Sequence, residues 1–160
     1  MKILETLLPW KRTIYTTVVL IIVLSILNFY GLFTNSFPVL NWENFAFPLF
    51  SLVHLLFLYV LRFKIKEYEH TDPQMKITEY LLYVVILLYL FYAFQTLTTL
   101  LSSFDFASHV IPNTFWPVGI LLFILQISLV ALSFMAIHFR KTLVGHYNMD
   151  EENQHIDSWE

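Results

Sequence analysis

The chain carries four long stretches without a charged side chain, separated by shorter polar segments. They cover residues 13–32, 45–61, 80–101 and 114–139 and consist mainly of Val, Ile, Leu and Phe. A helix needs about 20 apolar residues to cross the roughly 30 Å hydrocarbon core of a bilayer. A core helix of a soluble protein is shorter and has one polar face. The pattern therefore predicts an all-α fold, a four-helix transmembrane bundle.

The basic residues predict how this bundle is oriented. All nine lie in segments that would share one side of the membrane: Lys2, Lys11, Arg12, Arg62, Lys64, Lys66, Lys76, Arg140 and Lys141. The loops 33–44 and 102–113 contain none. Cytoplasmic loops are enriched in Lys and Arg. We therefore expect an up-down-up-down bundle in a bacterial inner membrane, with the N-terminal segment 1–12, the basic loop 62–79 and the acidic tail 140–160 in the cytoplasm.

Two spans begin with the same spacing, Asn-x-x-x-Pro, at Asn44 to Pro48 and at Asn113 to Pro117. An Asn side chain can cap a helix start because its oxygen accepts a free backbone N–H. Proline is tolerated in the first turn, where its missing N–H has no intrahelical partner. The spacing predicts Asn-capped helix starts at the outer face.

In the middle loop, Asp72 is expected to cap a helix that begins at Pro73, and the preceding helix is expected to continue to about Tyr68. Seven basic residues then flank the membrane, where they would mark topology and lie at the height of anionic headgroups: Lys11, Arg12, Arg62, Lys64, Lys66, Arg140 and Lys141. A role as topology signals is a simpler interpretation of these residues than specific lipid recognition.

The composition supports the membrane class, since 58% of the residues are apolar and only 13% are charged. A soluble domain would need about twice that charge. The chain has no cysteine and only three glycines. It contains no phosphate-binding loop, nucleophile elbow or zinc-protease motif, and its basic residues flank the membrane rather than form a nucleic-acid face. No cofactor, metal site or catalytic residue is predicted.

Each predicted span nevertheless carries a polar stripe. The stripes comprise Ser25, Asn28, Ser51, His54, Tyr92, Gln95, Thr99, Gln126 and Ser133. A polar group in lipid must find a partner, so the simpler interpretation is hydrogen bonding between helices. The alternative is a wet path, within one bundle or across an oligomer, in which His54 senses pH or binds a metal. A lone histidine is a weak metal signal.

The outer loops carry three titratable candidates, Glu43, Asp105 and His109, of which the last two are four residues apart. They would bind a cation or a partner, or simply be solvated loop charges. The tail after residue 141 is acidic and has no apolar period. It is expected to be a mobile cytoplasmic tail, or a peptide docked on the basic loop.

Three functional hypotheses follow. The first is a non-enzymatic accessory or structural subunit of a membrane system, which meets a membrane or cytoplasmic partner through loop 62–79 and tail 142–160. The second is a homo-oligomeric pore or membrane-perturbing effector of the lysis or anti-phage type. The third is a lipid-facing enzyme or small carrier that uses His54 with Gln95 or Gln126. A charge-coupled transporter is disfavoured because the spans contain no Lys, Arg, Asp or Glu away from their ends.

Overall fold

The computed structural model describes residues 8–40, 42–105 and 111–147. Over these ranges the chain is helical, and four helices are long and apolar enough to cross a membrane: α2 (Trp10–Leu27), α3 (Ala46–Glu67), α4 (Pro73–Ser102) and α5 (Phe115–Phe139). Two 3-10 turns, η1 (Trp42–Phe45) and η2 (Ser103–Asp105), lie before α3 and after α4, and a π-helical turn, η3 (Arg140–Val144), continues α5.

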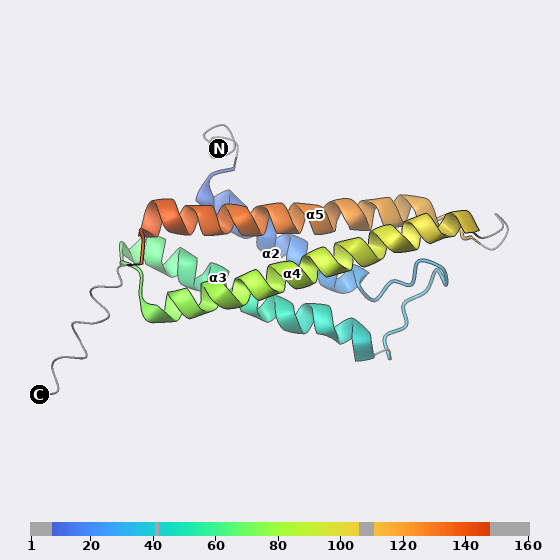
Figure 1. Cartoon of the computed structure of the whole chain (residues 1–160), viewed down its shortest axis with the longest axis horizontal. Coiled ribbons are helices and arrows are strands. Elements are labelled where there is room, and N and C mark those ends of the chain that lie inside the picture. Colours follow the sequence, from blue (N-terminus) through green and yellow to red (C-terminus); the bar gives the residue numbers. More distant parts are fainter. Residues whose placement is uncertain (1–7, 41, 106–110, 148–160) are drawn as a thin grey trace, which may run out of the picture.

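The four helices pack side by side along the long axis of the molecule (Figure 1). Helices α2 and α4 each contact both α3 and α5. One end of the bundle carries η1, η2 and the first turn of α5, and we call it the Trp42 end. The opposite end carries η3 and the first turn of α4, and we call it the Arg140 end. These two ends hold different polar clusters.

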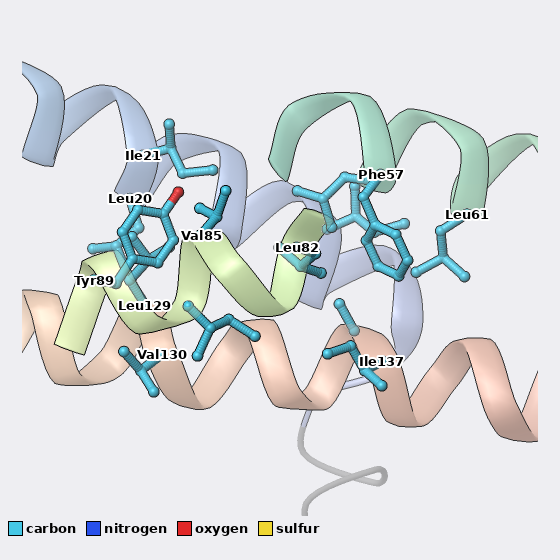
Figure 2. Close-up of a cluster of buried hydrophobic side chains, with 14 of the residues drawn as sticks. Leu20, Ile21, Phe57, Leu61, Leu82, Val85, Tyr89, Leu129, Val130 and Ile137 are labelled. Carbon is cyan, nitrogen blue, oxygen red and sulfur yellow. The ribbon is translucent and has the colours of Figure 1, made fainter. Parts of the chain in front are cut away.

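A continuous apolar core fills the middle of the bundle. Figure 2 shows side chains from all four helices that meet there, among them Leu20, Ile21, Phe57, Leu61, Leu82, Val85, Tyr89, Leu129, Val130 and Ile137. The outward faces of the helices are also apolar. Ile22, Leu52, Leu87 and Ile124 are each more than half exposed. A helix that faces lipid needs no polar side, so steric fit rather than amphipathicity selects the buried face.

The predicted C-terminal end of α3 and the predicted start of α4 are confirmed. Asp72 accepts a hydrogen bond from the Met75 amide at 2.7 Å, and Pro73 is the first residue of α4. Helix α3 runs to Glu67 and is capped by Tyr68 in the left-handed region, at φ 57°. A non-glycine residue in this region costs about 1 kcal/mol or more, so the tight α3–α4 connection carries local strain.

The predicted asparagine caps are wrong. The N-cap residues of α3 and α5 are Phe45 and Thr114, both with helical backbone angles and without a side-chain cap. Side-chain capping needs an extended cap residue, whereas η1 leads into α3 without an extended residue. Asn44 instead donates to the Pro38 carbonyl in the preceding loop. The amide of Phe115 is bonded to the carbonyl of residue 112 at 3.0 Å, so a backbone group satisfies it.

The two prolines do lie where the spacing placed them, since Pro48 and Pro117 are the third residues of α3 and α5. Helix α2 ends earlier than the apolar stretch 13–32, at Leu27. The chain then turns tightly, and the Gly31 amide bonds the Ser36 carbonyl at 2.9 Å. This turn moves the end of the first apolar stretch out of the helix and over the Trp42 end.

Candidate functional site

A cavity of about 510 Å³ opens at the Trp42 end, between the end of α2, η1, the first turns of α3, the last turns of α4 and the middle of α5. Its apolar wall includes Leu27, Leu32, Phe50, Leu88, Phe91 and Leu122. Cavities of about 300–1,000 Å³ that combine apolar walls with a few polar groups are typical of small-molecule sites. This cavity is therefore the candidate functional site.

The cavity brings together six of the predicted site residues: Asn28, Glu43, Tyr92, Gln95, Thr99 and Gln126. They come from three of the predicted polar stripes and from one outer loop. These residues lie close together because α4 packs against both α3 and α5. Among the neighbouring residues, Asn44 and Thr96 also line the cavity, and the sequence interpretation named neither as a site residue.

Two of these residues, Asn28 and Thr99, donate side-chain hydrogen bonds within the chain. The Asn28 Nδ2 donates to the Asn44 carbonyl at 2.8 Å and thereby ties the end of α2 to η1. The Thr99 hydroxyl donates to the Gln95 carbonyl at 2.8 Å within α4. Gln126 has a buried side chain, and its Oε1 has no hydrogen-bond partner within the described residues. An unsatisfied buried acceptor costs about 1–3 kcal/mol.

Deeper in the bundle, Ser51, His54 and Tyr89 form a second polar cluster. The Tyr89 hydroxyl donates to Ser51 Oγ at 3.1 Å and lies 3.4 Å from His54 Nδ1. His54 is fully buried, and its Nε2 has no hydrogen-bond partner. The ring of Phe47 packs against both Tyr89 and Tyr92, at 5.3 and 5.5 Å between centroids. Phe47 therefore stands between this cluster and the cavity, to which Tyr92 belongs.

At the Arg140 end, a buried ion pair joins α4 to η3. The Arg140 guanidinium approaches both carboxylate oxygens of Glu79 at 2.6 Å. Both side chains are about 95% buried. Tyr83 and Tyr147 also donate to this carboxylate, at 3.2 and 2.8 Å. Burial, together with the hydrogen bond to Glu79, raises the pKa of Tyr147 well above its usual range, so its hydroxyl remains a donor.

Gly145 directs the chain back onto this ion pair. It adopts φ 109°, which an L side chain rarely allows, and its carbonyl accepts a hydrogen bond from Arg140 Nη1 at 3.1 Å. The next carbonyl, of His146, accepts from the Thr71 hydroxyl, and the Arg140 guanidinium lies 4.4 Å from the Tyr147 ring centre. Residues 145–147 are thus docked on the start of α4, while residues 148–160 of the predicted tail lie outside the described residues.

The predicted topology residues fall into two groups. Lys64 and Arg140 are buried in ion pairs with the chain's own carboxylates. Lys64 Nζ lies 2.8 Å from Glu69 and 2.7 Å from Asp72. Burial opposes ionisation of Asp72, but the hydrogen bonds from Lys64 and the Met75 amide lower its pKa below the ordinary value. The remaining members are exposed: Lys11, Arg12, Arg62, Lys66 and Lys141.

Two further predicted site residues, Ser25 and Ser133, belong to none of these clusters. Ser25 is half-buried in α2, and Ser133 is fully buried but donates to the Leu129 carbonyl of its own helix. Asp105 ends η2, and His109 lies outside the described residues. In the described ranges no three His, Cys, Asp or Glu side chains gather as a metal site would require.

Sequence reasoning missed Tyr89, Glu79 and Tyr147. Tyr89 could have been found on the series Leu82, Ile86, Tyr89 and Ala93, whose steps of three and four residues follow one face of α4. No local pattern relates Glu79 to a partner 61 residues further along the chain.

Comparisons with protein-family models, with curated proteins and with solved structures find no significant match for this chain. Its function must therefore be argued from the clusters described above.

Proposed function

We propose that the protein is a non-enzymatic accessory or structural subunit of a membrane system in a bacterial inner membrane. It spans the membrane four times, up-down-up-down, with both termini in the cytoplasm, and it meets its partner through loop 62–79 and the tail. The distribution of the nine basic residues supports this orientation. Four helices long and apolar enough to cross a membrane support the span number.

One observation carries the choice among the three hypotheses. Four of the predicted polar residues, Ser51, His54, Gln126 and Ser133, are buried in the chain's own interior. A homo-oligomeric pore lined by these stripes would need them on the surface of each subunit. The core below the cavity is filled by side chains such as Phe57, Leu82 and Leu129, so a single bundle offers no continuous wet path there.

The Arg140 end supports a docking role. Ion pairs within the chain, Lys64 with Asp72 and Arg140 with Glu79, hold the start of α4 against the end of α3 and against η3. Tyr68, His70 and Glu67 stay exposed on loop 62–79, and the Tyr68 side chain is 93% exposed. Aromatic residues are enriched in protein interfaces, so a preformed loop with an exposed tyrosine suits a binding partner.

Orientation can be tested directly because the chain has no cysteine. Single substitutions Leu40→Cys and Tyr68→Cys place a thiol at an exposed position of each end. An impermeant maleimide should label Leu40→Cys in intact spheroplasts, and Tyr68→Cys only after permeabilisation. The opposite pattern would overturn the orientation.

The subunit role is tested by native mass of the full chain extracted in its own lipid. We expect one copy of the chain with a second protein at fixed stoichiometry. The variant Tyr68→Asn, which preserves the left-handed cap, should lose this partner, whereas Leu40→Asn at the opposite end should keep it. Truncation should follow Tyr147, because residues 145–147 are part of the bundle. A ring of identical copies that conducts ions in planar bilayers would refute the proposal and establish the pore.

A further inference from the structure

The cavity at the Trp42 end presents acceptors but no cationic side chain. Gln126 lines the cavity, and its Oε1 is buried without a hydrogen-bond partner. Glu43 lines the cavity as an exposed carboxylate and forms no ion pair within the described ranges. None of the described lining residues is Lys, Arg or His, and the loops 33–44 and 102–113 contain no Lys or Arg.

The walls of the cavity are rich in aromatic rings, including those of Trp42, Phe50, Phe91 and Tyr92. A ligand cation over such a ring gains attraction from the ring quadrupole. An anionic ligand would instead meet the Glu43 carboxylate with no basic residue on the described wall to offset it. Acceptors, rings and a single negative charge together select a cation that carries N–H donors.

The size of the cavity narrows the class further. Its volume of about 510 Å³ suits a small molecule, and its Leu side chains suit an apolar body. We infer that the cavity binds an apolar primary amine in its protonated form, with Gln126 Oε1 as acceptor of its N–H and the Glu43 carboxylate attracting it to the mouth. The source is either a free amine or the aminoethyl headgroup of phosphatidylethanolamine. This inference is independent of the proposed subunit role.

The test is equilibrium binding of radiolabelled 2-phenylethylamine to the full chain in phosphatidylcholine nanodiscs, with empty nanodiscs subtracted. We expect saturable binding, and at least about tenfold weaker binding of the neutral 2-phenylethanol. Gln126→Leu should weaken amine binding about tenfold or more. Glu43→Gln should weaken it by only about threefold, and this difference should shrink at high salt because exposed charges are screened.

Matched controls keep the test specific. Gln74→Leu and Glu67→Gln make the same changes at exposed positions of the Arg140 end and should leave binding unchanged. If Gln126→Leu does not fold, Ala46→Phe, which fills the cavity from the start of α3, should also abolish binding. Repeating the titration with phosphatidylethanolamine in the disc identifies the source. A lower apparent affinity there assigns the lipid headgroup, and an unchanged affinity assigns a free amine.

The inference is overturned by any of three results. The first is no saturable amine binding above empty nanodiscs. The second is equal binding of 2-phenylethanol, which would show that the charge and the N–H donors are irrelevant. The third is wild-type affinity in folded Gln126→Leu together with folded Ala46→Phe, which would place the bound amine elsewhere.

Discussion

Removing one member of the Glu79–Arg140 pair should be the most destabilising polar substitution in the bundle. The variant Glu79→Gln keeps the shape of the side chain but leaves the Arg140 guanidinium, 4% exposed, without its counter-charge. Removing one partner of a buried ion pair costs about 3–5 kcal/mol, because the remaining charge stays desolvated. For a chain of this length each kcal/mol lowers Tm by about 2–4 °C, so we expect a decrease of about 6–20 °C.

The assay is thermal unfolding of the full chain in nanodiscs, followed by circular dichroism at pH 7. The exposed pair between Lys66 and Glu67, at 3.1 Å, provides the matched control. Glu67→Gln should cost less than about 1 kcal/mol, as solvated pairs do. The double variant Glu79→Leu with Arg140→Met removes both charges and should recover most of the loss, since buried pairs are often replaced by apolar residues at little cost.

The reasoning depends on burial, and one result would refute it. If Glu79→Gln costs no more than Glu67→Gln, water must solvate the Arg140 guanidinium. If the double variant loses as much stability as Glu79→Leu and Arg140→Met lose in total when each is made alone, the two charges act independently, and this would also contradict the argument.

Three further predictions address single contacts. Tyr68→Gly should raise the free energy of unfolding by about 0.5–1 kcal/mol in the same thermal assay, because glycine adopts φ 57° without strain; unchanged stability would show that the cap is relaxed. Asp72→Asn should destabilise the fold at pH 7 because it removes the carboxylate charge that pairs with Lys64. Because the pKa of Asp72 is lowered from 3.8, its charge stabilises the fold above that pH, and the difference from wild type should vanish as the pH falls below it; a pH-independent difference would refute the ion pair. Tyr89→Phe should cost about 0.6 kcal/mol, and at most about 1.7 kcal/mol, because it removes a hydrogen bond near His54, and a larger loss would indicate that packing changed as well.

Local features of the fold could be predicted from the sequence because their causes are local. The Asp72 cap with Pro73 behind it is specified by adjacent residues, and the spans by the absence of charge over about 20 residues. The Asn44 and Asn113 caps failed for a non-local reason. Before α5, the Pro112 carbonyl already accepts from the first amide, that of Phe115. Before α3, η1 leads directly into the helix, so the cap position falls on Phe45 and not on Asn44.

The candidate site shows a different limit. In water, the buried face of a helix is its apolar face, and the period of the sequence reveals it. In lipid, both faces of α4 are apolar, so the stripe of Tyr92, Gln95 and Thr99 could be mistaken for the packed face. The packed face instead follows Tyr89 and Thr96.

The offset between the polar stripe and the packed face of α4 explains why a cavity forms. The stripe of Tyr92, Gln95 and Thr99 lies beside the packed face of α4. Side chains of α3 and α5 lie near it but do not fill the space next to it, so its polar groups line the cavity. Gln126, which α5 contributes from its packed face, then faces that space without a partner. An acceptor left unsatisfied in this way costs stability, and a donor bound in the cavity would relieve that cost. The offset between the polar stripe and the packed face of α4 is thus the structural basis of the amine binding that we propose.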